Sequence, residues 1–305
     1  MDFGFPIKFI SVLCCPKDGA TLELGQNCQL SKDGGFVRHG TMNCSACNAV
    51  FSINNGILDM LGHIALDDES KHEQQLRNKI KESAAEPAWW ENEDNYMEII
   101  PTLKALSVKQ DETILELGCG DGRYTTILAN ECQQILAVDF SLASLEILQQ
   151  RLKESRNVGL VLGDITAMKF RGSIFDHVLS TLVSNLPTQQ HRNAMYRLAA
   201  NALKPTGRFT FSAHNQGVRQ IIRGERKSDR YQPGGIYRYN FTVSECKAEV
   251  RPYFEKIKAT PIQIYFPFAR TLRLPLVSLS RFLEHVPLIK GLGNLFCVRL
   301  RDLFA

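Results

Sequence analysis

Short apolar runs and segments of helical character alternate along the middle of the chain. Five runs have the length of a buried strand, and they cover residues 113–118, 134–139, 158–164, 175–181 and 207–214. Between them, residues 122–131, 141–154 and 189–203 have helical character. Strand and helix repeated at this interval predict a parallel sheet that is covered by helices on both faces.

The alternation changes after residue 214. A helix is expected near 243–251, and two further strands are expected in KIKATPIQIYF and NLFCVRLRD. Two stretches, 215–241 and 267–293, are too long and irregular for ordinary connections and are expected to form lid-like insertions. The fold class predicted is α/β, with a doubly wound, mostly parallel sheet of seven strands.

Both insertions combine basic with aromatic or apolar side chains. In 215–241, six arginines and lysines alternate with three tyrosines, which suits an anionic or planar substrate but is also typical of a solvated basic loop. In 267–293, leucines lie among arginines. This second insertion is expected to cap an apolar substrate, to contact an anionic membrane surface, or to pack onto the sheet.

The first part of the chain has a different pattern. Residues 1–62 contain short apolar stretches separated by glycines, and they are interpreted as a small β-rich module. Residues 63–88 form a polar, helical linker, with a helix expected over 66–86. This helix is either a solvated linker or a cover over a cofactor site. Residues 89–305 then form the main domain.

Composition narrows the class of protein. The 305 residues are 44% apolar and 22% charged, with a formal net charge of +4, as in an ordinary globular protein. No stretch has the roughly 20 consecutive apolar residues that a membrane span needs. The first residues lack the pattern of a signal peptide, so a cytoplasmic location is expected, where clustered cysteines more often bind metal than form disulfides.

The stretch ILELGCGDGRY, residues 114–124, is the strongest candidate for a binding loop. An apolar strand containing Glu116 is followed by Gly118, Gly120 and Gly122 and then by a helix, which lets a ligand approach the backbone closely. A dinucleotide site prefers Gly-x-Gly-x-x-Gly. Here the third glycine comes one position early, and Arg123 stands where that pattern has glycine.

This loop and four later segments resemble the class I S-adenosylmethionine-dependent methyltransferases, and most closely the group called methyltransferase type 11. The segments are VDFS, GDITAMKF, FDHVLSTLVSNLP and ALKPTGRFTFS, in that order. The resemblance implies a Rossmann-like fold, with Asp139 on the ribose, Phe140 against the adenine, and Asp164 and Ile165 near the adenine ring. The cofactor-binding residues that it implies are Glu116, Gly118, Cys119, Gly120, Gly122, Asp139, Phe140, Asp164, Ile165 and Ser180.

The cysteines near the start of the chain resemble the two knuckles of a zinc ribbon, such as those fused to methyltransferases. Cys44 and Cys47 form an intact Cys-x-x-Cys turn, whereas Cys15 is followed three positions later by Asp18. The resemblance implies one structural zinc held by these four residues, with Cys14 as a possible substitute ligand. The alternative is a decayed ribbon that is held together by its own small core.

The acceptor of the methyl group is less well defined. Acceptor-side groups are expected at the carboxyl ends of the fourth and fifth strands, namely Ser180, Thr181, Ser184, Asn185, His214 and Asn215. His214 is the candidate general base, and a histidine that only hydrogen-bonds its loop is the alternative. Enzymes of this family that methylate base or glutamine amino groups carry an Asn-Pro-Pro-Tyr-like tetrapeptide after the fourth strand, and SNLP does not match it.

Three functions therefore stay open. The first is a methyltransferase that acts on O, N or C of a small-molecule acceptor, such as a natural-product or lipid-like intermediate. The second is an RNA methyltransferase, which the basic and aromatic residues of 215–241 favour. The third is a non-catalytic binding scaffold that contacts a partner through the cysteine module.

Overall fold

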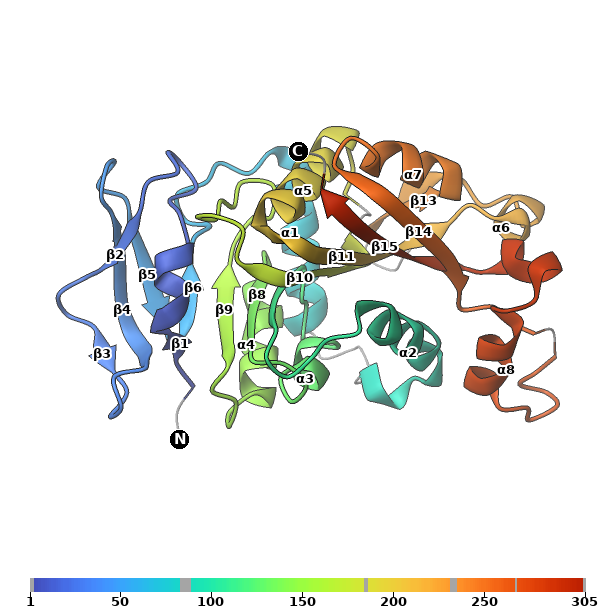
Figure 1. The fold of residues 1–305 in the computed structure, drawn as a ribbon, viewed down its shortest axis with the longest axis horizontal. Helices are drawn as coiled ribbons and strands as arrows, with labels where there is room; N and C mark the ends of the chain where they lie inside the picture. The colour runs from blue at the N-terminus through green and yellow to red at the C-terminus, as the bar shows by residue number, and fades with distance from the viewer. Residues whose placement is uncertain (1–2, 83–88, 184–185, 231–234, 267, 304–305) are drawn as a thin grey trace.

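The structure, a computed structural model, describes residues 3–82, 89–183, 186–230, 235–266 and 268–303. Seven strands at its centre follow the order β9-β8-β7-β10-β11-β15-β14 (Figure 1). Their bounds are β7 (Thr113–Leu117), β8 (Gln134–Asp139), β9 (Val158–Leu162), β10 (Phe175–Thr181), β11 (Leu203–Asn215), β14 (Phe254–Ile262) and β15 (Leu295–Leu303). All neighbours among them are parallel except the pairs that involve β15. The predicted doubly wound, mostly parallel sheet is confirmed.

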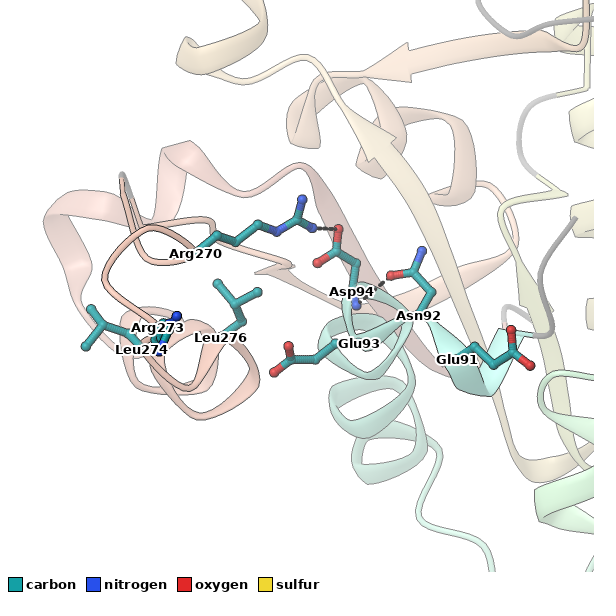
Figure 2. Close-up of a pocket in the computed structure, with 8 residues that line it drawn as sticks. All are labelled: Glu91, Asn92, Glu93, Asp94, Arg270, Arg273, Leu274 and Leu276. Carbon is teal, nitrogen blue, oxygen red and sulfur yellow. Dashed lines mark hydrogen bonds and ion pairs between the residues drawn. The ribbon is translucent and has the colours of Figure 1, made fainter.

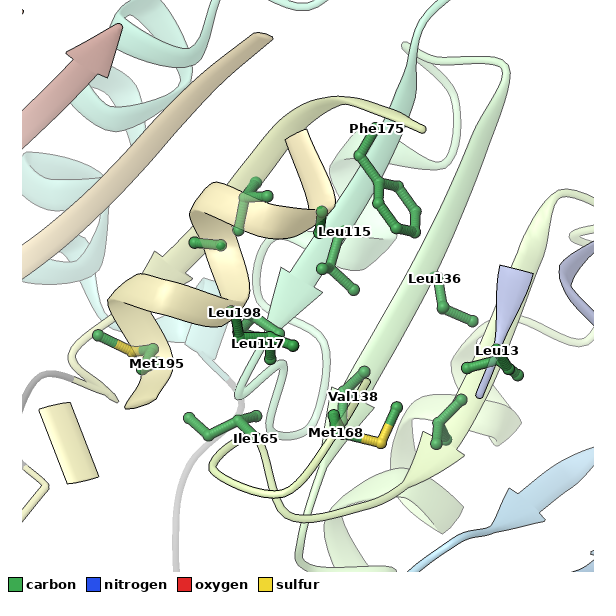
Figure 3. Packing of buried hydrophobic residues seen from close by; sticks show 14 of the residues in the cluster. Leu13, Leu115, Leu117, Leu136, Val138, Ile165, Met168, Phe175, Met195 and Leu198 are labelled. Atoms are coloured by element: carbon green, nitrogen blue, oxygen red, sulfur yellow. The ribbon is translucent and has the colours of Figure 1, made fainter. Parts of the chain in front are cut away.

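Helices cover both faces of these strands. The bounds are α2 (Glu93–Leu106), α3 (Thr125–Leu128) and α4 (Leu142–Arg151) on one face, and α5 (Gln189–Ala202) and α7 (Val243–Val250) on the other. Successive strand residues alternate between the two cores because side chains in a strand point to opposite faces. Leu115 and Leu117 pack with Met195 and Leu198 of α5 (Figure 3), whereas Ile114 packs on the α4 side.

The helix α2 is the main element that the sequence did not predict. Pro101 lies within it, and proline inside a periodic segment usually marks the end of a helix. The helix nevertheless begins with a good cap, since the Asn92 side chain accepts a hydrogen bond from Asp94 N at 3.0 Å. Burial of one face against β11 and β15 stabilises the rest of the helix.

Residues 3–62 form the expected β-rich region. It comprises β1 (Phe5–Pro6), the 3-10 helix η1 (Ile7–Val12), β2 (Leu22–Leu24), β3 (Gln29–Leu30), β4 (Phe36–Cys44), β5 (Val50–Asn54) and β6 (Ile57–Asp59). Strand β6 pairs in parallel with β9, and Met60 N donates to Leu162 O at 2.8 Å. Leu13 shares one core with Leu136 of β8 (Figure 3). The region thus extends the central sheet and packs into its core.

Both insertions contain more regular structure than the sequence indicates. The first, 215–241, holds α6 (Val218–Ile222), β12 (Ser228–Arg230) and β13 (Tyr237–Phe241), and His214 of β11 lies opposite Asn240 of β13. The hairpin of β12 and β13 adds to the end of β11, so this insertion is partly regular. The second insertion holds α8 (Leu276–Leu283) and the 3-10 helix η4 (Pro287–Leu292). The remaining elements are α1 (Asp68–Glu82) and η2 (Trp89–Glu91).

Candidate cofactor site

The glycine loop turns sharply between β7 and α3. Gly118, Gly120 and Gly122 have φ values of +72°, +55° and +92°, a region that side chains with a Cβ rarely adopt. The amides of Gly118 and Cys119 both donate to Val138 O, at 2.8 and 3.1 Å, which ties the loop to the end of β8. A Cβ at Gly120 would meet open space, so the backbone there is accessible to a ligand. Glycine is needed at Gly120 for its backbone angle.

Asp139 at the end of β8 holds the loop from the other side. Its carboxylate accepts from Gly120 N at 2.8 Å and from Ser141 N at 2.9 Å. Burial raises the pKa of Asp139, and these two amides oppose that shift by favouring the ionised form. The residue that the resemblance assigns to the ribose therefore also fixes the glycine loop in place.

Glu116 lies behind the loop. It is 2% exposed, and its carboxylate accepts a hydrogen bond from Thr125 Oγ1 at 2.7 Å, which links β7 to the start of α3. Burial, together with the neighbouring charge of Asp139, raises the pKa of Glu116 to about 8, and the hydrogen bond from Thr125 opposes this shift. Glu116 is thus placed to support the loop from within the protein.

A cavity of about 320 Å³ opens at the carboxyl ends of these strands. This is the edge where ligands bind in open α/β sheets. Of the residues that the sequence assigned to the cofactor, seven line the cavity: Gly118, Cys119, Gly120, Asp139, Phe140, Asp164 and Ile165. Glu116, Gly122 and Ser180 lie behind its wall, where Ser180 Oγ donates to Leu117 O at 3.1 Å.

Helix α1 packs over this cavity. Gln74 Nε2 donates to Phe140 O at 2.7 Å, and Asn78 Oδ1 accepts from Ser141 Oγ at 2.7 Å. Glu73 and Arg77 line the cavity from the same helix. Of the two interpretations of the polar segment, the helix over a cofactor site is the one that the geometry supports.

One wall of the cavity is apolar. Leu182, Val183, Leu186, Pro187 and Ile236 line it, and they come from the segment after β10 and from the 215–241 insertion. Ser184 and Asn185, which the sequence placed among the acceptor-side groups, lie outside the described residues. Thr181 lines the cavity as expected, whereas the amide of Asn215 is buried and donates to Gly293 O at 2.7 Å.

The surroundings of His214 do not favour it as a general base. Burial, together with the positive charge of Arg238, lowers the pKa of His214 to about 3. A group with so low a pKa is a weak proton acceptor at neutral pH. Among the described residues, those that line the 320 Å³ cavity do not include His214.

A buried carboxylate that the sequence did not indicate supports Arg123. Glu98 on α2 is 2% exposed, and it pairs with Arg123 Nη1 at 2.8 Å and accepts from Ser212 Oγ at 2.6 Å. Arg123 lines the cavity next to the glycine loop. The pair therefore fixes the residue that replaces the glycine of a dinucleotide site. No local pattern could have shown it, because 25 residues separate the partners.

The four predicted metal ligands come together at one point. One ligand atom each from Cys15, Asp18, Cys44 and Cys47 lies within 4.8 Å of the other three. The sulfurs of Cys15 and Cys47 are 3.7 Å apart, and the Cys44 sulfur lies 3.4 Å from Asp18 Oδ2. Three thiols and one carboxylate in this arrangement fit a tetrahedral zinc site. Cys14 does not belong to the group; its amide donates to Lys169 O at 3.1 Å.

Comparisons with known proteins agree with this geometry. Residues 114–207 match the family model of a methyltransferase domain. The chain is 32% identical over 82 residues to ribosomal RNA small subunit methyltransferase A of Syntrophus aciditrophicus, covering 26% of this chain and 29% of that protein. It is 29% identical over 127 residues to malonyl-[acyl-carrier protein] O-methyltransferase of Priestia megaterium, covering 41% and 45%. The chain thus spans less than half the length of these two relatives.

A solved structure resembles a larger part of the chain. The N-methyltransferase NodS of Bradyrhizobium japonicum, in complex with S-adenosyl-L-homocysteine, superposes with a TM-score of 0.54 at 15% identity, covering 76% of this chain and 98% of that one. At this identity the likeness shows the fold. Residues 114–207 therefore match a methyltransferase domain, and the fold and the glycine loop agree with the predicted resemblance to the class I S-adenosylmethionine-dependent methyltransferases.

Proposed function

We propose that the protein transfers a methyl group from S-adenosylmethionine to O, N or C of a small-molecule acceptor of natural-product or lipid-like character. The observation that carries this proposal is the cavity at the strand ends, which is polar beside the glycine loop and Asp139 and apolar beyond β10. The polar part suits the cofactor. The apolar part suits an acceptor that is itself largely apolar.

The residues of the cavity have distinct proposed roles. Asp139 accepts hydrogen bonds from the ribose, while Phe140, Asp164 and Ile165 surround the adenine. The open backbone at Gly120 receives the methionine end of the cofactor. The bound cofactor supplies an electrophilic methyl group on a sulfonium, and the protein contributes mainly by positioning the acceptor in line behind it.

An RNA acceptor is the alternative function. Its support is the relative in Syntrophus aciditrophicus, which is named for ribosomal RNA, together with the basic and aromatic residues of 215–241. Against it stands the apolar wall, since RNA-binding sites present aromatic and cationic groups. The third function, a non-catalytic scaffold, applies if the cavity does not bind the cofactor.

We further propose that Cys15, Asp18, Cys44 and Cys47 hold one structural zinc. The support is the convergence of their ligand atoms and the hydrogen bonds from the amides of Ala46 and Cys47 to the Cys44 sulfur, both 3.4 Å. Amide donors of this kind stabilise a thiolate. The proposed division is a zinc-ribbon-like module over 1–62, a helical linker over 63–88 and a methyltransferase domain over 89–305.

Calorimetry and transfer assays test the proposed function. S-adenosylmethionine should bind the purified protein, and a labelled methyl group should appear on small apolar acceptors and be absent from RNA. If RNA co-purifies, and its affinity falls steeply with salt, the alternative is favoured. If the cofactor does not bind, the enzyme proposal fails.

A further inference from the structure

Exposed apolar side chains concentrate at one end of the molecule. Among the described residues, nine of the fourteen large apolar side chains that face solvent lie in 218–222 or 266–292. The most exposed of them are Ile222 (79%), Phe268 (77%) and Phe282 (67%). We call residues 218–227 and 266–292 the α6–α8 end; both helices lie at the right of Figure 1. A concentration of this kind usually marks an interaction surface.

The α6–α8 end is anchored to the rest of the protein. Leu276 and Ala269 are buried against Met97 of α2, and Ile264 N donates to Ser280 Oγ of α8 at 3.0 Å. Helix α6 packs against η4, and Arg219 Nη1 donates to Asn294 Oδ1 at 3.2 Å. Only some of the apolar residues of the 267–293 insertion therefore pack onto the domain, as one of the three expectations had it. The others are exposed to solvent, although the segment that carries them is folded.

A groove separates the α6–α8 end from the start of α2 (Figure 2). It has a volume of about 630 Å³, and its walls carry Glu91, Glu93 and Asp94 on one side and Arg270 and Arg273 on the other. Arg270 Nη2 pairs with Asp94 Oδ2 at 2.6 Å across it. Because both signs of charge line the groove, it does not select an anion.

The charge of the α6–α8 end indicates which partner. Residues 218–227 and 266–292 contain eight arginines and lysines and two glutamates. Asp94 and Glu245, which pair with Arg270 and Lys227 from outside these segments, raise the acidic count to four. The excess of four positive charges equals the net +4 of the whole chain. Two copies of such a surface would repel each other, whereas an anionic lipid surface would attract it.

We propose that the α6–α8 end docks on the surface of an anionic phospholipid bilayer. Phe268, Phe282 and Ile222 enter the boundary between headgroups and acyl chains, and the arginines beside them contact lipid phosphates. The helices in the described part of the chain are all too short or too polar to span a bilayer. The proposed contact is a peripheral one with the bilayer surface. The inference extends beyond the proposed methyl transfer and does not require it.

Vesicle flotation tests this surface. The full-length protein is mixed with vesicles of phosphatidylcholine alone, or of phosphatidylcholine with phosphatidylglycerol. We expect flotation with the mixed vesicles only, weakening as salt is added. The double variant Phe268→Ser/Phe282→Ser should bind at least about tenfold more weakly, because two large apolar side chains no longer enter the lipid. Its matched control is Leu30→Ser on β3, a site 52% exposed, which should bind as the wild type does.

A second pair of variants tests the charge. Arg223→Glu/Arg273→Glu should lose at least about tenfold in affinity for the mixed vesicles, and the exposed Lys153→Glu should lose much less. The proposal is overturned if the wild type does not float with anionic vesicles, or if the control variants weaken binding equally. It is also overturned if Phe268→Ser/Phe282→Ser instead abolishes a dimer seen without vesicles. Cofactor binding, measured separately by calorimetry, shows whether the proposed function fails independently.

Discussion

The cofactor cavity and the cysteine cluster are both built from loops, but they are held in place by different forces. In the cavity, the carboxylate of Asp139 is already satisfied by two backbone amides, and the glycine loop is tied to Val138. In the cluster, backbone amides also reach Asp18 and the Cys44 sulfur, but the side chains of Cys15, Asp18, Cys44 and Cys47 lie close to one another. The cavity is organised before any ligand arrives. The cluster brings together groups that repel once they are deprotonated, so a cation would stabilise it.

Because of this difference, substitutions in the two regions should affect different properties of the protein. Changes in the cavity should alter affinity for the cofactor and leave the free energy of unfolding nearly unchanged, except where a group also supports the loop. Changes in the cluster should alter stability and leave affinity nearly unchanged. The four predictions below test this contrast, starting with the largest expected effect.

Asp139→Ala should weaken the binding of S-adenosylmethionine by on the order of a hundredfold, because it removes an ionised acceptor and releases Gly120 N. Isothermal calorimetry measures the affinity. The exposed Asp111→Ala is the control for loss of a carboxylate and should bind normally. An unchanged affinity in Asp139→Ala would remove the basis of the ribose assignment.

Cys44→Ser should abolish the binding of about one zinc per chain and lower the melting temperature by several degrees. Elemental analysis and thermal melts measure the two effects. Cys28→Ser is the matched control in the same region, since its side chain lies outside the cluster and donates to Gly25 O. Asp18→Cys should bind zinc more tightly than the wild type, because it completes a Cys-x-x-Cys turn with Cys15. Equal metal content in Cys44→Ser and wild type would show that the cluster is a decayed ribbon.

Gln74→Ala/Asn78→Ala should weaken cofactor binding by roughly three- to tenfold, because α1 loses its hydrogen bonds to Phe140 O and Ser141. Gln75→Ala, an exposed position on the same helix, is the control and should bind as the wild type does. If both variants bind equally, α1 is only a linker, and the cavity does not depend on its cover.

Glu116→Gln should change the pH dependence of stability. The pKa of Glu116 is raised to about 8 in the folded protein. Its contribution to the free energy of unfolding is therefore fully present at low pH and is lost as the pH rises from the ordinary pKa of 4.5 through 8. Glutamine cannot ionise, and its amide oxygen can still accept from Thr125. The variant should therefore gain a few degrees in melting temperature over the wild type at pH 9 compared with pH 5. The exposed Glu131→Gln should show the same difference at both pH values.

Much of the cofactor site was predictable because its information is local. The apolar run before Gly118, the glycine spacing and the carboxylate at the end of the next strand are all short-range features, and parallel strands carry them to one edge of the sheet. The helix α1 was predicted as a helix, but its place over the cavity depends on the contacts of Gln74 and Asn78 with Phe140 and Ser141, which are more than 60 positions away in the sequence. The pairing of Glu98 with Arg123 was hidden for the same reason.

The sequence alone determined the alternation of strands and helices, the glycine loop with Asp139 and Asp164, and the residues of the cysteine cluster, because period and spacing are properties of neighbours in the chain. Only the tertiary structure decided that β6 extends the central sheet through β9, that His214 is partly buried with a lowered pKa, and that Phe268 and Phe282 stay exposed while Leu276 does not. Burial depends on which distant segments pack together, and no pattern within one segment specifies that.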